Sequence, residues 1–544
     1  MKTGSSQQKA LLAGSWKWAL VLAGAALYLL LANDSRHHWH EWRHLYSASN
    51  YSVDQLARGE FDPGPPPERS AAEVGAWYWG QLGHEAFLRE GVGLLGQGLV
   101  TARVLGWLYG VAMLLTAVII TMTLRRLPIT VPPELVGGVV LFSPLGLYLG
   151  FKLMGEVPAL FFAALACLLL TASLDAPQRS RRVIALGACA VTLALTFLFK
   201  VFLPLYFLGF AAALAVAFPQ FYSRKQLATH VLSVMAGAAL LAGLAGVLHG
   251  VALGDWPHIY AFFRGYRQPQ AASLFGILTA GSLLYVLAAL APLAGSQRAR
   301  DLRFFAAWLA GSTLPVLALA TNFVESRYLT VGLAAFAGLV ALGLVGMLDR
   351  LQSRFRSVRW RKAAFVAILP LIPIFGVATQ PFMPFEMNSS ELVKAARLVW
   401  ADAPDAAVLL PWNYTDYHFL AFAYPDRPIY LVQSAVDEHG KPYRDPAWER
   451  RMGRIYGESF VPGPEQLRQV GNREKVYIGH GILPPFSNLS RLATTLGASW
   501  VVERLEAMEP RVHISESWMW IDPRIHLEPT ARVGEYRVFA VGTR

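Results

Sequence analysis

Cysteine and charged side chains are scarce in this sequence. Only two residues are cysteines, Cys167 and Cys189, and both fall inside apolar stretches, so the chain carries no disulfide framework. Charged residues make up 15% of the chain, whereas soluble domains average about 25%. Hydrophobic residues make up 54%. This balance excludes an ordinary soluble enzyme and predicts a multi-span membrane protein.

Apolar stretches long enough to cross a hydrocarbon core of about 30 Å, at about 1.5 Å per residue, recur along the chain. We expect about eleven transmembrane helices, at 11–32, 98–123, 134–151, 157–174, 183–200, 201–218, 231–250, 277–294, 304–320, 329–348 and 363–379. The first could instead be a cleavable signal peptide, but its apolar run extends back to Leu11 and no A-x-A cleavage site is evident.

Lysine and arginine are distributed unevenly between the two sets of span ends. The segments at one set of ends hold nineteen of them, from Lys2 to Lys362, whereas the short loops at the other set of ends hold five. Because cytoplasmic loops collect cations, the N-terminus is predicted inside and residues 380–544 outside. The net charge of +12 is therefore explained by cations at the ends of membrane spans, and no nucleic-acid partner is predicted.

Two segments outside the bilayer are large. Residues 33–97 form a first outer loop, with interfacial helices predicted near 37–46 and 71–89. After residue 380 an amphipathic helix at 391–400 and short strands near 407–410, 428–432, 475–478, 500–502 and 536–540 predict an extracytoplasmic α/β domain. The predicted division is 1–379 for the membrane domain and 380–544 for the outer domain. The sequence shows no P-loop, dinucleotide fingerprint or nucleophile elbow.

Ionisable residues gather at the predicted outer ends of the spans. Asp34 ends the first span, and Glu41 would share its face of a helix seven residues later. The further candidates are Lys152, Glu156, Lys200, Asp255, His258, Arg264, Arg267, Glu325, Arg327 and Tyr328. Intramembrane charges are costly, so such a ring predicts a reaction site.

Carboxylates facing cations at a membrane surface suit transfer from a lipid-phosphate donor. A carboxylate takes the proton of the attacking hydroxyl, and fixed positive charge stabilises the leaving phosphate. Simpler roles stay open: Lys152 and Lys200 could extend to the interface, and Glu325 could pair locally with Arg327. His37, His40, Glu41 and His44 have a spacing that resembles metal ligands, although we favour polar packing at the interface.

This arrangement resembles the GT-C superfamily of polytopic glycosyltransferases, which includes protein mannosyltransferases and lipid A aminoarabinose transferases. The shared features are Asp34 at the end of the first span, the long first outer loop, Gly155-Glu156-Val-Pro158 opening the fourth span and Glu325-Ser-Arg327-Tyr328-Leu329 opening a late one. The likeness covers about residues 10–380, through short motifs.

The resemblance implies an inverting transfer from a polyprenyl-phosphate sugar to a hydroxyl acceptor of the cell envelope, outside a bacterial inner membrane. It implies that Asp34 is the base, with Glu156 as the second catalytic candidate. Lys200, Arg264, Arg267 and Arg327 are then candidates for the donor phosphate. No cofactor is named; a divalent metal ion is the one candidate. The alternatives are a secondary transporter, for which no repeat or midplane charge is evident, and a polysaccharide polymerase or ligase.

Overall fold

The structure is a computed structural model in which parts of the outer loops and of the C-terminal region are not described. The described residues are 22–33, 36–62, 70–250, 298–319, 326–354, 373–374, 386–411, 414–432, 446–461, 476–481, 525–533 and 536–543.

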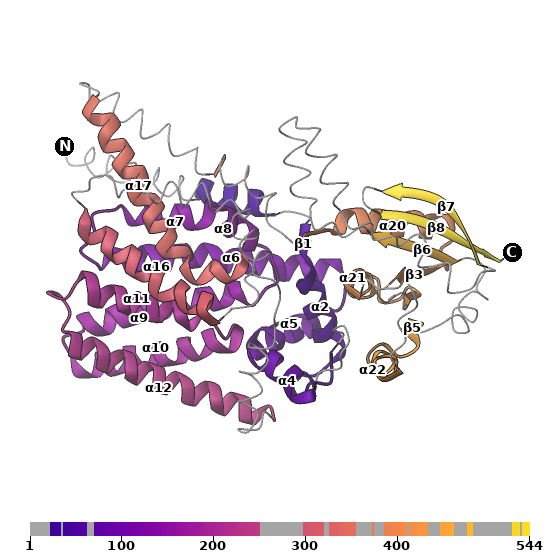
Figure 1. Ribbon diagram of the computed structural model, residues 1–544, viewed down its shortest axis with the longest axis horizontal. Helices are drawn as coiled ribbons and strands as arrows, with labels where there is room; N and C mark the ends of the chain where they lie inside the picture. Colours follow the sequence, from indigo (N-terminus) through magenta and orange to yellow (C-terminus); the bar gives the residue numbers. More distant parts are fainter. Residues whose placement is uncertain are drawn as a thin grey trace, which may run out of the picture.

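Apolar helices lying side by side form the larger part of the protein (Figure 1). Five helices among the described residues are long and apolar enough to cross a membrane. They are α6 (Leu99–Arg125), α9 (Glu156–Asp175), α10 (Arg179–Phe199), α12 (Arg224–Leu248) and the helical stretch Tyr328–Arg350. This last stretch consists of most of the 3-10 helix η4 (Ser326–Gly332) and of α17 (Leu333–Arg354). Shorter apolar helices are Leu22–Ala32, α7 (Pro133–Phe142) and α11 (Pro204–Ala217), and α16 spans Ala299–Leu319. The predicted spans at 277–294 and 363–379 lie outside the described residues, apart from 373–374, so the count of eleven stays a prediction.

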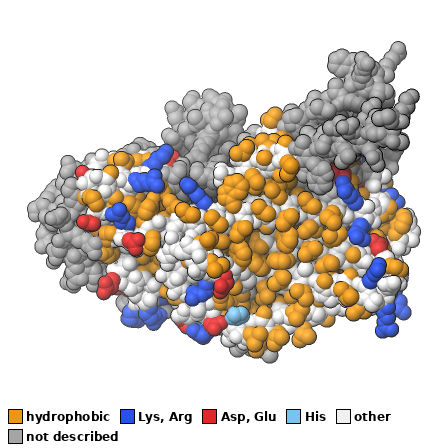
Figure 2. All heavy atoms as spheres, turned by 180° about the vertical axis from the view of Figure 1, so that it is seen from behind, with side chains coloured by type: hydrophobic (Ala, Val, Ile, Leu, Met, Phe, Trp, Pro, Cys, Tyr) orange, Lys and Arg blue, Asp and Glu red, His pale blue; other side chains and the backbone are white. Residues whose placement is uncertain are grey.

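The surface of this helical part is largely hydrophobic, as Figure 2 shows for one face. Large apolar side chains such as Trp107 and Val118 of α6, and Leu240 and Leu244 of α12, are exposed. A continuous apolar surface of this kind is costly in water and favourable against lipid.

The cation-rich helix ends lie together at one end of the bundle. Arg126, after α6, contacts Asp175 at the end of α9, with 3.5 Å between the side-chain atoms, and Arg298 lies 3.0 Å from Asp349 of α17. Asp301 of α16 accepts hydrogen bonds from the backbone of Thr130 and Val131. The described residues at these helix ends, all predicted to be cytoplasmic, thus share one end of the bundle, although the side of the membrane stays a prediction.

The stretch predicted as a single span at 134–151 is divided, which corrects that prediction. Helix α7 ends at Phe142, and α8 (Pro144–Leu149) begins directly after Ser143, which is extended at φ −66° and ψ 155°. Proline disfavours a helical conformation in the residue before it, and the Ser143 hydroxyl caps the new helix by accepting from Gly146 N at 3.0 Å. Residues 150–155 then form a loop that leads into α9.

The first outer loop contains more elements than expected. It has β1 (Arg36–His38), α2 (Trp39–Asn50), α3 (Val53–Ala57), α4 (Ala71–Trp79) and α5 (Leu82–Leu95). The helix expected near 71–89 is broken at Gly80, whose carbonyl accepts a hydrogen bond from Val201 N at 3.1 Å. This bond fixes the turn between α4 and α5 against the end of α10.

The residues after 386 include a six-stranded sheet in the order β5-β4-β3-β6-β8-β7. Its strands are β3 (Ala407–Pro411), β4 (Ile429–Val432), β5 (Phe460–Val461), β6 (Val476–Gly481), β7 (Ile525–Val533) and β8 (Tyr536–Thr543). Strands β5, β4, β3 and β6 run parallel, and β8 is antiparallel to β6 and to β7. The helices are α20 (Ser389–Asp402), α21 (Tyr414–Ala423) and α22 (Pro446–Tyr456). Four of the predicted strands are confirmed, and 500–502 lies outside the described residues.

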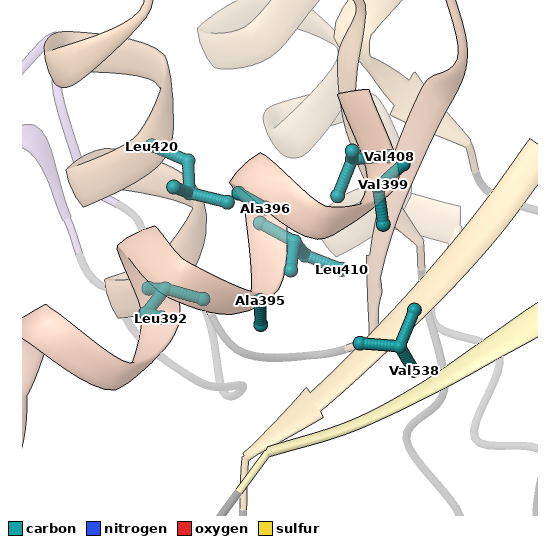
Figure 3. A pocket seen from close by; sticks show the side chains of 8 residues that line it. All are labelled: Leu392, Ala395, Ala396, Val399, Val408, Leu410, Leu420 and Val538. Carbon is teal, nitrogen blue, oxygen red and sulfur yellow. The ribbon is translucent and has the colours of Figure 1, made fainter. Parts of the chain in front are cut away.

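Aliphatic side chains from α20, α21, β3 and β8 converge on one another and form the core of this region (Figure 3). The gap they enclose is about 10 Å³ and has no polar lining residue. It is a packing seam and offers nothing to a polar substrate.

The sheet region is joined to the first outer loop. Strand β1 pairs antiparallel with β2 (Glu386–Asn388), and the ring of Trp42 on α2 lies 4.2 Å from that of Phe419 on α21. Asp62 and Arg451 form a buried ion pair at 3.2 Å. The predicted boundary at residue 380, and the location of this region outside the cytoplasm, stay predictions.

Candidate functional site

A buried ion pair marks the end of the bundle opposite the cation-rich loops. Helices α9 and α10 form an antiparallel hairpin, so the first residue of α9 and the residue after α10 lie at the same end. These residues are Glu156, which is fully buried, and Lys200, and the Lys200 Nζ lies 3.1 Å from Glu156 Oε1. Because a buried carboxylate needs compensation, this pair holds the two groups at a fixed place.

The loop before α9 brings two more predicted residues to the same end. Glu41 of α2 is fully buried, and its Oε2 accepts a hydrogen bond from the backbone N–H of Leu153 at 2.9 Å. The neighbouring Lys152 is also buried, with Nζ 5.4 Å from the centroid of the Tyr148 ring. The first outer loop is therefore fixed directly to the loop that opens α9.

Glu85 of α5 is a third buried carboxylate at this end. Its Oε1 is hydrogen-bonded to Nδ1 of His44, and its Oε2 accepts from the Ser47 hydroxyl at 3.1 Å. The adjacent His84 is also fully buried, and its Nδ1 lies 2.8 Å from the Tyr109 hydroxyl of α6. The carboxylates of Glu85, Glu156 and Glu41 all act electrostatically on this hydroxyl, so the three acids lie in one region of the fold.

Burial controls the charges of these groups. Burial raises the pKa of Glu85 to about 7, against the opposing effects of His84, Ser47, Arg43 and Lys200. Burial also lowers the pKa of His84 to about 3, so its imidazole is neutral at neutral pH. The Arg43 guanidinium lies over the Trp77 ring, 4.4 Å from the centroid, in a cation–π contact.

The structure brings together Glu41, Lys152, Glu156 and Lys200 of the predicted residues. Tyr328 is next to them, because its ring lies 5.0 Å from that of Phe202, which in turn lies 5.8 Å from Lys200 Nζ. The other predicted residues lie outside the described residues: Asp34, Asp255, His258, Arg264, Arg267 and Glu325. Arg327 belongs to η4, but its side chain is not described.

A metal site is not found in the part of the chain that the structure describes, where no group of three or more His, Cys, Asp and Glu could hold an ion. Of the four residues with metal-like spacing, Glu41 binds the Leu153 N–H and His44 binds Glu85. These two contacts agree with polar packing.

Sequence reasoning missed His84, Glu85 and Tyr109. The available signal was the buried face of α5, where Glu85, Leu88 and Val92 recur at i, i+3 and i+7 and only the first is charged. A carboxylate on an otherwise apolar helix face points to a polar partner inside the fold.

Comparison of the sequence with protein-family models and with curated proteins finds no match. Among solved structures, the chain is similar to ArnT from Cupriavidus metallidurans in the apo state, at 14% identity and a TM-score of 0.52, over 97% of this chain and 98% of that one. The same protein bound to undecaprenyl phosphate gives 14% identity, the same coverages and a TM-score of 0.51. The apo oligosaccharyltransferase of Archaeoglobus fulgidus gives 10% identity and a TM-score of 0.49, over 97% of this chain and 74% of that one. The resemblance to the GT-C fold is confirmed.

Proposed function

We propose that this protein is an integral membrane glycosyltransferase that transfers a sugar from a polyprenyl-phosphate donor to a hydroxyl acceptor. The observation that carries the proposal is the Lys200–Glu156 pair, buried beside Glu41 and Lys152 in a fold similar to that of ArnT. One of the ArnT structures is bound to undecaprenyl phosphate, a lipid phosphate of the class that the proposed reaction releases.

The reaction is a single displacement at the anomeric carbon. The acceptor oxygen forms a bond to this carbon while the bond from the carbon to the phosphate oxygen breaks, which inverts the configuration. The acceptor proton goes to a carboxylate, and the phosphate leaves with the electron pair of the broken bond. Lys200 and Lys152 supply positive charge that suits the departing phosphate.

We assign the base to Asp34 and a second catalytic role to Glu156. Asp34 ends the first predicted span. Strand β1 (Arg36–His38) lies between it and α2, so the two acids do not share one helix face as the sequence predicted; the place of Glu41 beside Leu153 supports a site at this end of the bundle. The donor phosphate is assigned to Lys200 together with cations of the later outer loops, namely Arg264, Arg267 and Arg327. The site faces away from the cation-rich helix ends, which agrees with an extracytoplasmic reaction in a bacterial inner membrane.

The experiment uses the purified full chain in detergent. It is incubated with short-chain polyprenyl-phosphate sugars carrying glucose, mannose or aminoarabinose, and with an envelope-lipid extract as acceptor. We expect release of free polyprenyl phosphate from one of these donors. Lys200→Gln should reduce the release strongly, whereas Lys225→Gln, which changes an exposed cation at the opposite end of the bundle, should not. A folded wild-type protein that releases polyprenyl phosphate from none of the donors contradicts the proposal.

A further inference from the structure

Glu85 joins two helices of the first outer loop, α5 and α2, through both of its carboxylate oxygens. Oε1 is bonded to His44 and Oε2 to Ser47, while the Ser47 hydroxyl also lies 3.0 Å from the His44 carbonyl oxygen. Three residues before His44, Glu41 is bonded to Leu153 N. Helix α2 therefore has a polar stripe that is fixed at one point by the loop before α9 and at the next by α5.

The His44–Glu85 pair is enclosed by charged and titratable groups. Its described surroundings come from α2, α4, α5, α6 and the end of α10, and are Arg43, Tyr78, His84, Tyr109 and Lys200. Lys200 acts on Glu85 and also forms the ion pair with Glu156. The charge of the His44–Glu85 pair therefore changes the electrostatic potential at Lys200, where the proposed donor phosphate would bind.

We propose that the His44–Glu85 pair is a positioning element that holds one proton, and that binding of the anionic donor requires this proton. The inference rests on the proposed function. With one proton more than a neutral imidazole and a carboxylate hold together, the pair has no net charge; without this extra proton, it is a neutral imidazole and a carboxylate and carries one negative charge beside Glu156 and Glu41. A phosphodiester brought to Lys200 is then repelled, because like charges repel one another strongly where water is excluded.

Neutral pH is the range in which this proton is exchanged. Glu85 has its pKa raised by burial to about 7, so the pair keeps its proton below this pH and loses it above. His84, with a pKa lowered by burial to about 3, stays neutral throughout. Donor affinity should thus fall as the pH rises, whereas the catalytic step, which needs an ionised base, should not fall with it.

The test measures KM for the donor and kcat from about pH 6.5 to about pH 8.5, where one linked proton with this pKa allows at most a roughly 25-fold rise in KM. We expect the wild-type KM to rise about three-fold or more while kcat changes less. Glu85→Gln retains the size of the side chain, an oxygen that accepts from Ser47 and an N–H that donates to His44, but cannot lose the proton. Across this pH range, the KM of Glu85→Gln should therefore stay near the value that the wild-type protein has at about pH 6.5. Glu90→Gln, the same substitution at an exposed position of α5, should keep the wild-type profile.

A second measurement covers the case in which Glu85→Gln does not fold. Calorimetry of donor binding to the wild-type protein without acceptor, in buffers of different ionisation enthalpy at about pH 7.5, should show proton uptake on binding. Any of three results overturns the inference: a wild-type KM that does not change with pH, a KM of Glu85→Gln that rises with pH as steeply as the wild-type KM, or donor binding without proton uptake. Each of these results leaves the glycosyltransferase assignment intact, because that assignment fails only if no donor is turned over.

Discussion

Antiparallel hairpins explain why part of the site could be predicted residue by residue. Glu156 and Lys200 lie at the predicted outer ends of two successive predicted spans, and an antiparallel hairpin of two spans brings these ends together. Glu85 could not be placed in this way, because its partners His44 and Ser47 come from a helix about forty positions earlier. Only the tertiary fold shows which face of α5 meets which face of α2.

Asp34 is the residue on which the proposed mechanism depends most. Asp34→Asn keeps the shape of the side chain but removes the basic oxygen, so we expect turnover to fall by roughly 10²–10⁴-fold with little change in donor affinity. Turnover of the purified variant measures this. Glu60→Gln, an exposed carboxylate of the same loop, is the control and should retain activity. If Asp34→Asn stays within a few-fold of the wild type, Glu156 becomes the candidate base.

Lys200 is expected to serve both stability and activity, and substitutions can separate the two. Lys200→Met leaves fully buried Glu156 without its ion-pair partner, which should lower the free energy of unfolding by about 3–5 kcal/mol. Adding Glu156→Gln removes the uncompensated charge and should restore most of that loss. Activity should stay low in both variants, because the cation beside the phosphate is absent. Denaturant unfolding in detergent and donor turnover measure the two effects, and a fully active double variant would exclude Lys200 from the reaction.

Secondary-structure elements were more accessible to prediction than their breaks. Long apolar runs gave α6, α9 and α10 within a few residues, because hydrophobic length alone specifies a membrane helix, whereas α12 begins seven residues before its predicted span. The division at Ser143-Pro144 was missed even though the proline signal was present. The hydropathy of the stretch does not change at such a break. A proline also does not always end a membrane helix, because the helix can continue through it with a kink.

A close approach between α12 and α4 gives a prediction at the scale of elements. A Cβ atom at Gly246 would lie 2.2 Å from Nε1 of Trp79, a ring that is itself buried. Gly246→Ala should therefore destabilise the protein by about 1–3 kcal/mol. At Gly243 on the same helix, an added Cβ meets no described atom within 4 Å. Gly243→Ala should therefore raise the free energy of unfolding by about 0.5–1 kcal/mol through helix propensity. Thermal unfolding of the two variants compares them directly, and equal shifts would contradict the close packing.

At the scale of the whole molecule, the charge asymmetry predicts topology. With nineteen cations at one set of loops and five in the short loops of the other, the C-terminal region should lie outside the cytoplasm. A reporter that is active only in the cytoplasm, fused after Arg544, should be silent, and one placed after Arg126 should be active. Strong activity at both positions would show that the number of spans is even.

The contact between the two outer segments could not be predicted from the sequence. Trp42 and Phe419, or Asp62 and Arg451, are ordinary residues of their local elements, and no periodicity relates one segment to the other. Their pairing follows from the shape of the folded surfaces.

The Asp62–Arg451 pair also constrains how the chain is made. Its partners are separated by 389 positions, so at typical synthesis rates of about 5–20 residues per second, Asp62 waits about 20 to 80 s for its partner to be synthesised. On the predicted topology, the first outer loop is translocated during that interval, before the surface that it packs against exists. The aromatic face of α2, including Trp42, then lacks its packing partner Phe419 until the rest of the chain is made. On the predicted topology, the first outer loop is therefore fully packed only after the C-terminal region has been translocated.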